Sequence, residues 1–284
     1  MENNAVKTTS NIDLLRIDLE KCTLCGRCAE VCPSGVIGMD EQGPKVMKPF
    51  CLSCGHCVAV CPYDALDNVK APLANQIPLK KMPILDEDTA ELFLRSRRSV
   101  REYKETPVPR ETLGKLLDVA RFAPTSGNSQ GIAFKVIDDK DTLRSITAVT
   151  VDYIEEALKL PPIAGSPLVG PFSAYVADYR QNGKDVVLRN APCLVVAMAD
   201  KNFRNGPVNT PFILAYAELY APSLGLGTCM TGFFDGCAST GYQPLLNILN
   251  LPENMRVTGG LMVGHPKYTY RRLVDRNPLQ VIWQ

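Results

Sequence analysis

The chain has 284 residues, of which 45% are hydrophobic and 21% are charged, and its formal net charge is +1 at pH 7. This length suggests about two domains, and the composition is that of a globular protein with at least one sizeable core. A net charge so close to zero argues against nucleic-acid binding through phosphate neutralisation. The N-terminal residues show no secretory signal, and the longest apolar run, residues 193–199, is too short for a membrane helix. We therefore expect a cytoplasmic protein with neither nucleic acid nor membrane as a partner.

Eight of the 11 cysteines lie in two runs with the same spacing, C-x2-C-x2-C-x3-C-P, which begin at residues 22 and 51. Disulfides suit small secreted proteins, and zinc sites usually use two separated C-x2-C pairs. The spacing is instead that of bacterial ferredoxins with two [4Fe–4S] clusters, in which the fourth cysteine of each run ligates the other cluster. One cluster is therefore predicted on Cys22, Cys25, Cys28 and Cys61. The second is predicted on Cys51, Cys54, Cys57 and Cys32.

Residues 12–70 are expected to form one compact ferredoxin-like domain after a tail of residues 1–11, with a small hairpin over residues 35–47. This segment has few large apolar residues, so cluster binding and folding should be coupled. His56 lies inside the second run, but four thiolates already complete that site, which predicts a surface histidine.

Residues 71–87 contain three prolines and are expected to form an extended linker to a larger domain, residues 88–284. Asp88 and Glu91 are spaced as a helix capping box. A helix should follow Pro109, with an apolar stripe that consists of Leu113, Leu116, Leu117 and Ala120.

The larger domain mixes expected strands and helices without regular βαβ alternation, which predicts an α+β fold. Buried strands are expected at residues 133–138, 193–199 and 258–264, and an apolar helix over 209–227 that closes at Gly225. Residues 160–190 have a weak pattern and are expected to form Pro/Gly-rich loops.

No common catalytic or nucleotide-binding motif is complete in the larger domain. Met230 occupies a position where the G-x-G-x-x-G fingerprint needs glycine, and there is no phosphate-binding P-loop motif. The chain has only two histidines, so a Ser-His-Asp hydrolase is poorly supported. A bound cofactor is therefore expected to supply the chemistry.

Four arginines and two serines fall within residues 95–101. They could form a solvated basic surface, or a phosphate clamp for which the planar guanidinium group is well suited. Residues 124–130, PTSGNSQ, could supply hydrogen bonds to the edge of a heterocycle.

Five segments occur in the order seen in FMN-dependent nitroreductases: RRSVREY, APTSGNSQ, LGLGTCMTGFFD, GHPKYTYRR and RNPLQVIW. Residues 88–284 thus resemble this family, and the preceding cysteine runs are similar to those of its ferredoxin-fused branch. The resemblance implies a central sheet flanked by helices, with FMN bound at the interface of an intertwined homodimer.

The resemblance also implies roles for individual residues. Arg97, Arg98 and Ser99 match the family's phosphate and ribityl contacts, and Arg101 matches a cation at the pyrimidine edge of the flavin. A loop that reaches the flavin from the partner subunit is matched by Pro124, Thr125, Ser126 and Asn128. The turn over the flavin, where a backbone N–H meets N5, is matched by Met230, Thr231 and Gly232, of which Thr231 and Gly232 would be catalytic. A C-terminal phosphate site is matched by Arg271, Arg272 and Arg276.

The chain departs from the family at some positions. Many relatives have Trp where this chain has Met230, Pro222 interrupts the 209–227 helix, and the expected substrate pocket around residues 153–185 matches no known pattern. The remaining cysteines are Cys193, Cys229 and Cys237, and all three are expected to be core residues. A redox role is the alternative for Cys229.

Together these features predict an iron–sulfur flavoprotein oxidoreductase with two [4Fe–4S] clusters and FMN. It would pass electrons from a donor such as ferredoxin through the clusters to FMN, and on to a nitroaromatic, quinone or enone. Alternatives are an NAD(P)H-oxidising enzyme with the clusters as electron outlet, a non-catalytic electron-transfer or redox-sensing protein, and a reductive dehalogenase on the same scaffold.

Overall fold

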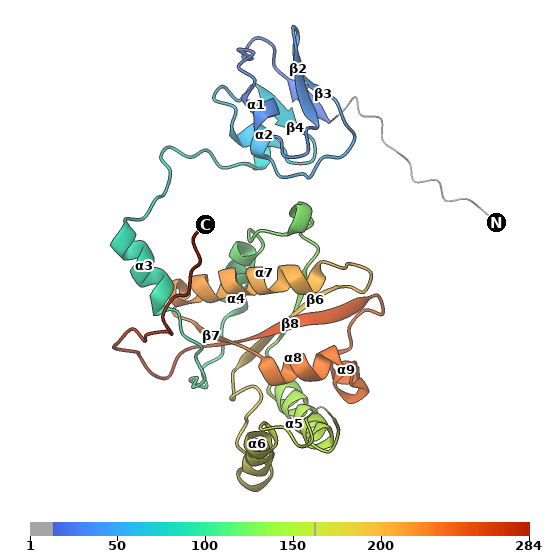
Figure 1. Cartoon of the computed structure of the whole chain (residues 1–284), viewed down its shortest axis with the longest axis vertical. Helices are drawn as coiled ribbons and strands as arrows, with labels where there is room; N and C mark the ends of the chain where they lie inside the picture. The colour runs from blue at the N-terminus through green and yellow to red at the C-terminus, as the bar shows by residue number, and fades with distance from the viewer. Residues whose placement is uncertain (1–13, 162) are drawn as a thin grey trace, which may run out of the picture. The chain divides into compact units, whose positions relative to one another are not determined.

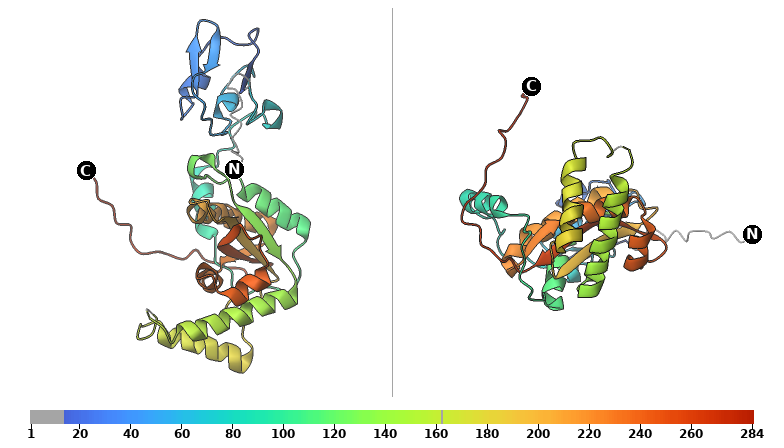
Figure 2. Two further views of the ribbon diagram at one scale, coloured as in Figure 1. Left: turned by 90° about the vertical axis from the view of Figure 1, so that its right-hand side faces the viewer. Right: turned by 90° about the horizontal axis from the view of Figure 1, so that it is seen from below.

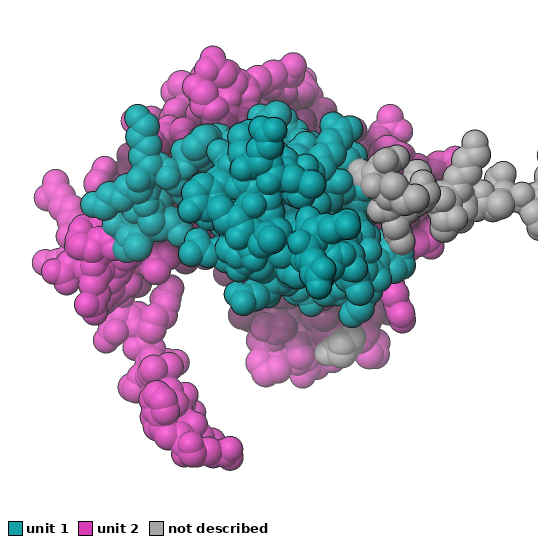
Figure 3. Space-filling model, turned by 90° about the horizontal axis from the view of Figure 1, so that it is seen from above, with its two compact units in different colours: residues 1–84, 127–129 teal, residues 85–126, 130–284 magenta. Residues whose placement is uncertain are grey.

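The computed structural model describes residues 14–161 and 163–284, which divide into two units. Unit 1 consists of the described residues up to 84 together with 127–129, and unit 2 consists of 85–126 and 130–284 (Figure 3). The boundary falls within the predicted linker, 71–87, whereas the predicted tail of residues 1–11 lies outside the described residues. None of the helices in the described ranges is long and apolar enough to cross a membrane.

Unit 1 is built from short strands and helices. Its elements are β1 (Leu15–Ile17), α1 (Arg27–Glu30), β2 (Ile37–Asp40), β3 (Gly43–Val46), α2 (His56–Ala59), β4 (Leu66–Asn68) and a 3-10 helix at Leu73–Asn75. Strands β2 and β3 pair antiparallel, which confirms the hairpin predicted over 35–47, and β1 pairs antiparallel with β4. The buried core is small and consists of Val36, Ile37, Cys57, Val58 and Leu66. The partly buried cysteines that pack against it are Cys28, Cys32 and Cys51.

The repeat in the cysteine runs is also present in the backbone of unit 1. Helices α1 and α2 begin directly after Gly26 and Gly55, which have φ values of 75° and 73°. Such left-handed conformations are readily adopted by glycine. Leu24 and Ser53, at the corresponding positions two residues earlier, share φ values of 57° and 56°. The two runs therefore fold as two copies of one local structure.

Unit 2 contains a sheet covered on both faces by helices (Figure 1). Its strands are β5 (Ala133–Ile137), β6 (Cys193–Asp200), β7 (Gly227–Met230) and β8 (Met255–Gly264). Its helices are α3 (Glu87–Ser96), α4 (Arg110–Ala120), α5 (Lys140–Ala157), α6 (Val169–Asn182), α7 (Gly206–Tyr220), α8 (Gly232–Ser239) and α9 (Gln243–Leu249). The strand order is β5-β6-β8-β7, with antiparallel pairs. This arrangement is the predicted α+β fold.

Alternating side chains of β6 give the sheet its two apolar faces. Val195 and Ala197 pack with α4 and α7, whereas Leu194 and Val196 pack with residues of α5, α8 and α9. The strands expected at 133–138, 193–199 and 258–264 are confirmed as β5, β6 and β8, and the predicted apolar stripe of α4 is buried at Leu113, Leu116 and Ala120. Helix α7 continues into a 3-10 turn, Ala221–Leu224, and closes at Gly225 as predicted.

Two predictions about helices are wrong. Helix α3 is capped by Asp86, whose side chain accepts a hydrogen bond from the Thr89 N–H, so Asp88 and Glu91 do not form the capping box. Residues 169–182, expected as loop, form α6, which lies along α5 (Figure 2). The rings of Phe172 and Tyr175 meet Phe233 of α8 edge to face, so tertiary packing stabilises a helix that the sequence pattern does not indicate.

Candidate functional site

The eight thiols of unit 1 form two groups around separate cavities. One cavity is lined by Cys22, Cys25, Cys28 and Cys61, called here the Cys22 group. The other is lined by Cys51, Cys54, Cys57 and Cys32, called here the Cys51 group. Each group combines three thiols of one run with the fourth thiol of the other, as α1 and α2 each carry the last cysteine away from its own loop. This is the grouping predicted for cluster ligands.

The spacing of these thiols does not suit a single metal ion. Across residues 14–161 and 163–284, no three His, Cys, Asp or Glu side chains lie close enough to hold one ion. A tetrahedral zinc site with bonds of about 2.3 Å would bring its sulfurs to within about 4 Å of one another. A core of four irons and four sulfides holds its four thiolates farther apart than a single ion does.

Hydrogen-bond donors surround both thiol groups. The N–H of Ser53 lies 3.4 Å from Cys51 Sγ, and the N–H of Ala65 lies 3.3 Å from Cys61 Sγ. Burial disfavours the Cys32 thiolate, but hydrogen bonds from the N–H groups of residues 34, 36 and 37 and from the Ser34 hydroxyl together lower the pKa of the Cys32 thiol. Donors to sulfur stabilise thiolates, the form in which cysteine binds iron.

In unit 2, the arginine-rich segment lies along the edge of the sheet. Ser99 bridges Thr228 of β7, and the Val100 N–H donates to the Thr228 carbonyl oxygen at 2.8 Å. Side chains in an extended segment alternate between two faces. Arg98 lines a cavity of about 410 Å³ with Ser96 and Val100, and Arg97, Ser99 and Arg101 are not among its lining residues. The structure therefore separates Arg98 from the other predicted contacts.

Arg97 is held by a buried carboxylate. Its guanidinium group lies 3.4 Å from Glu218 Oε1 of α7, and the Thr228 hydroxyl lies 3.5 Å from the same oxygen. The side chain of Glu218 is 8% exposed and that of Arg97 is 27% exposed, so one end of the ion pair reaches solvent. Burial raises the pKa of Glu218, although the nearby Arg97 opposes this shift.

Positive charge gathers beside the β7–α8 turn. Cys229 is buried, which raises the pKa of its thiol, while Arg101 and Arg189 favour its ionised form. Arg189 and Asn190 both have left-handed backbones, with φ values of 57° and 52°. The carboxylate of Asp185 stabilises this turn by accepting hydrogen bonds from three N–H groups, at residues 187, 188 and 190.

The β7–α8 turn rests directly on β8. Thr231 is fully buried, and its N–H donates to the Gly260 carbonyl oxygen at 3.3 Å. A Cβ at Gly260 would lie 2.3 Å from Thr231 Oγ1, so only glycine permits this approach. The Thr231 hydroxyl donates to Asp235 Oδ1 at 2.8 Å, and burial raises the pKa of that carboxyl to about 7. Met230 stays exposed at the end of β7.

Gly232 opens α8 next to this turn. Apart from its chain neighbours and its own helix backbone, no atom of residues 14–161 or 163–284 lies within 4 Å of the position that its Cβ would occupy. The first N–H groups of a helix have no partner within the helix. Of the two residues predicted to be catalytic, Thr231 is buried beneath the turn, whereas Gly232 has open space beside it.

The other predicted contacts lie elsewhere on the chain. The Ser126 N–H donates to Asn209 Oδ1, and the Thr125 hydroxyl accepts from the Gln130 N–H. Asn128 belongs to unit 1, where its amide donates to the carbonyl oxygens of Leu52 and Ser53. Pro124, Arg271, Arg272 and Arg276 are exposed. Within this chain, neither the 124–128 loop nor the C-terminal arginines are brought to the β7–α8 turn by any hydrogen bond between described residues.

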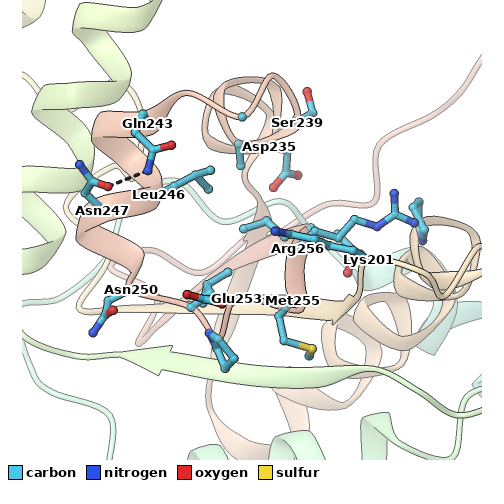
Figure 4. Close-up of a pocket in the computed structure, with 18 residues that line it drawn as sticks. Lys201, Asp235, Ser239, Gln243, Leu246, Asn247, Asn250, Glu253, Met255 and Arg256 are labelled. Carbon is cyan, nitrogen blue, oxygen red and sulfur yellow. Dashed lines mark hydrogen bonds between the residues drawn. The ribbon is translucent and has the colours of Figure 1, made fainter. Parts of the chain in front are cut away.

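A cavity of about 840 Å³ in unit 2 lies on the face formed by α8, α9 and the start of β8 (Figure 4). Asp235 and Ser239 of α8 line it together with Lys201, Arg256 and Gln243. None of the residues predicted as contacts is among the described side chains that line this cavity. It shares Asp235 with the support of the β7–α8 turn.

Sequence reasoning missed three charged residues near the turn: Arg189, Glu218 and Asp235. For two of them a signal exists, because Glu218 and Asp235 are isolated acids inside the otherwise apolar runs 210–226 and 229–238. A charged residue in such a run must be paired or have a shifted pKa. Arg189 has no such signal, since its position follows from a turn that Asp185 stabilises.

Residues 94–265 match the family model described as "Nitroreductase family", and residues 14–62 match the model described as "4Fe-4S dicluster domain". The chain is 29% identical over 175 residues to an FMN reductase (NAD(P)H) of Bacillus subtilis, which covers 61% of this chain and 64% of that protein. It is 27% identical over 216 residues to an NADH dehydrogenase of Thermus thermophilus, which covers 72% of this chain and 98% of that protein. The match to the Bacillus protein therefore spans less than two thirds of its length.

Among solved structures, unit 2 is similar in fold to a nitroreductase with bound FMN from Desulfitobacterium hafniense. The TM-score is 0.54 at 21% identity, over 70% of this chain and 100% of that chain. An iodotyrosine deiodinase bound to FMN and 3-iodo-L-tyrosine gives a TM-score of 0.53 at 21% identity, over 68% of this chain and 97% of that chain.

Proposed function

Because the chain belongs to the nitroreductase family and carries a 4Fe-4S dicluster domain, we propose that it is an iron–sulfur flavoprotein oxidoreductase that uses FMN. In this proposal two [4Fe–4S] clusters take electrons singly from a donor such as ferredoxin, and FMN passes them to a small nitroaromatic, quinone or enone. The observation that carries the proposal is the division of the eight thiols into the Cys22 and Cys51 groups.

The residues of unit 1 fit such clusters. Each group offers four thiols, and backbone N–H groups lie 3.3–3.4 Å from sulfurs of both groups. A reduced cluster is negatively charged, and such donors stabilise that charge. The Cys22 group would hold one cluster and the Cys51 group the other.

The residues of unit 2 fit FMN at the β7–α8 turn. Arg97 and Ser99 would hold the phosphate and ribityl chain, and Arg101 would bring positive charge to the pyrimidine edge, where it favours the anionic reduced flavin. The Gly232 N–H would meet N5, with Thr231 as the buried support of the turn. Arg98 lines a different cavity, and its terminal nitrogens donate to the carbonyl oxygens of Arg95, Arg97 and Arg272. Its predicted contact with the phosphate would need these hydrogen bonds to be exchanged.

The remaining contacts would come from a second copy of the chain. In a homodimer, Pro124, Thr125, Ser126 and Asn128 would approach the partner's FMN, and Arg271 and Arg272 would complete a phosphate site. Exposed apolar side chains support such an interface, with Phe212 on α7 at 52% and Trp283 in the tail at 88%. The extended course of the C-terminal residues also supports it (Figure 2). A cytoplasmic location stays a prediction.

The names of the relatives favour a second candidate function. Proteins named FMN reductase (NAD(P)H) and NADH dehydrogenase suggest NAD(P)H as the electron donor, with the clusters as the outlet. The absence of a G-x-G-x-x-G fingerprint does not oppose this, because a nicotinamide can stack directly on a flavin.

The two candidates differ in which donor reduces the flavin fast. The protein, purified without oxygen, is mixed in stopped flow with chemically reduced ferredoxin, NADH or NADPH, and the flavin absorbance is followed. The control is the same chain loaded with FMN but not iron. Fast bleaching by ferredoxin that is lost in the control supports the clusters as the entry port. Fast bleaching by a nicotinamide in both samples supports the second candidate, and bleaching by neither donor would contradict both.

A further inference from the structure

The internal repeat of unit 1 identifies one position at which the two thiol groups differ in chemistry. Each position of the first run has its counterpart 29 residues later, as with Cys22 and Cys51. By the same separation, Asn68 is the counterpart of Met39. Met39 lines the cavity of the Cys22 group, and Asn68 lines the cavity of the Cys51 group. The repeat therefore places an amide at one group where the other has a thioether.

Asn68 directs its amide hydrogens at the sulfurs of the Cys51 group. It is 2% exposed, and its Nδ2 lies 3.6 Å from Cys57 Sγ and 3.8 Å from Cys51 Sγ. Its Oδ1 accepts a hydrogen bond from the Lys70 N–H at 3.0 Å, which fixes which end of the amide faces the sulfurs. A buried amide needs acceptors, and thiolate sulfurs are far better acceptors than neutral thiols.

Met39 cannot perform this role at the Cys22 group, because a thioether has no hydrogen to donate. Backbone N–H groups reach sulfurs of both groups. In the Cys22 group they belong to Arg27, Ala29 and Ala65, and in the Cys51 group to Ser53, Val58 and residues 34, 36 and 37. The Ser34 hydroxyl, 3.9 Å from Cys32 Sγ, adds a weak contact on the same side as Asn68. In the Cys22 group the Thr23 hydroxyl hydrogen-bonds Cys25, but both residues are exposed to solvent. Asn68 therefore differs from it as a side-chain donor that is itself buried.

A donor aimed at ligating sulfurs changes the reduction potential of a cluster. The reduced cluster carries one more negative charge, so a buried N–H dipole stabilises it more than the oxidised cluster. Solvent acts in the same direction at the exposed Cys25 of the Cys22 group. The effect of Asn68 is therefore measured as the change in the potential of the Cys51-group cluster when methionine replaces Asn68, and not as the difference in potential between the two clusters.

We propose that Asn68 raises the reduction potential of the cluster held by the Cys51 group and thereby makes the two clusters inequivalent. This rests on the proposed function, which supplies the clusters and the donor of the electron. The step concerned is the addition of one electron from that donor, with no bond formed or broken in the chain. In a population of molecules that have taken up one electron, the fraction with that electron on the Cys51-group cluster would be larger in the wild type than in Asn68→Met.

The test is a potentiometric titration of the full-length protein, monitored by EPR at low temperature, after iron, sulfide and FMN have been measured. Asn68→Met should lower one of the two cluster potentials. At a fixed ambient potential, the ratio of reduced to oxidised cluster should fall about tenfold, which corresponds to a drop of about 59 mV in the reduction potential of a one-electron couple. The reciprocal variant, Met39→Asn, should raise the potential of the other cluster. Asn75→Met is the control, because Asn75 lines neither cavity.

The outcomes separate the inference from the proposed function. Wild-type protein without clusters would overturn both. Two clusters whose potentials are unchanged in Asn68→Met and Met39→Asn would overturn the inference and leave the proposed function standing. Shifts of the same cluster by both variants would also overturn it. If Asn68→Met does not fold, Met39→Asn decides, since a gain of potential at the other cluster is expected from the new amide alone.

Discussion

Replacing Asp235 by Asn should change how the stability of unit 2 depends on pH. Asp235 lies in the first turn of α8, where burial raises the pKa of its carboxyl to about 7. The Thr231 hydroxyl and the Gly260 N–H oppose this rise but do not cancel it. The native protein therefore holds a proton in a pH range where the unfolded chain has released it. Asparagine keeps the shape and an acceptor oxygen but does not titrate.

The direction of the effect follows from proton linkage. The unfolded carboxyl has its ordinary value of 3.8, and the native value is raised to about 7. The stability that protonation provides is fully present below the unfolded value and is lost as pH rises through about 7. Between these values the free energy of unfolding falls by at most about 1.4 kcal/mol per pH unit. From pH 5.5 to 7 the loss is at most about 2 kcal/mol, or roughly 4–8 °C in melting temperature for a domain of this size.

The assay is thermal unfolding of the wild type and of Asp235→Asn at intervals from pH 5.5 to 8.5. The melting temperature of the variant minus that of the wild type should rise up to about pH 7 and then become constant. Asp139→Asn is the matched control, because Asp139 caps α5 by accepting from Thr142, which lowers its pKa. Asp139 is ionised in both the native and the unfolded protein throughout this pH range. The melting temperature of Asp139→Asn should therefore differ from that of the wild type by a constant amount.

A difference for Asp235→Asn that stays flat across this pH range would refute the reasoning. It would mean that Asp235 is already ionised in the native protein, with water or a cation reaching it through the cavity of Figure 4. A difference that falls with rising pH would be a stronger contradiction, since it would require a lowered native pKa.

Three further predictions concern the proposed sites. Removing iron with a chelator should unfold residues 14–84, whose apolar core is small, and leave unit 2 folded, as measured by limited proteolysis. Gly232→Ala should leave the melting temperature of the FMN-free protein nearly unchanged but weaken FMN binding at least tenfold, whereas Gly236→Ala, with equally open space, should not weaken it. Arg97→Met should destabilise the FMN-free protein at pH 8 by about 2 kcal/mol, because Glu218 loses its cation, and adding Glu218→Gln should recover most of this loss in thermal unfolding.

The sequence predicted the parts of the fold that depend on local patterns. The hairpin at 35–47 follows from glycine placement, and the strands at residues 133–138, 193–199 and 258–264 follow from short apolar runs. Helix α6 could not be predicted, because its stability depends on aromatic contacts with α8, far along the chain. The start of α3 was misplaced by two residues, since Asp86 and Asp88 are equally good caps and only the backbone conformation decides between them.

The candidate sites were predicted to different extents for the same reason. Regular spacing specifies the thiol groups, so the two sets of four could be assigned before the structure was known. At the β7–α8 turn, the sequence indicated the residues that face a ligand but not those behind them. Glu218 and Asp235 act through contacts with Arg97 and Thr231, which only the packing of α7 and α8 against the sheet brings about.

The most direct test of the account is the cofactor content of the chain purified without oxygen. Iron and acid-labile sulfide analysis, with the visible spectrum and identification of the released flavin, should give about eight irons, about eight sulfides and one FMN per chain. Zinc in place of iron would contradict the assignment of the Cys22 and Cys51 groups as cluster ligands. Iron and sulfide without any flavin, even after incubation with FMN, would contradict the assignment of Arg97, Ser99, Arg101 and Gly232.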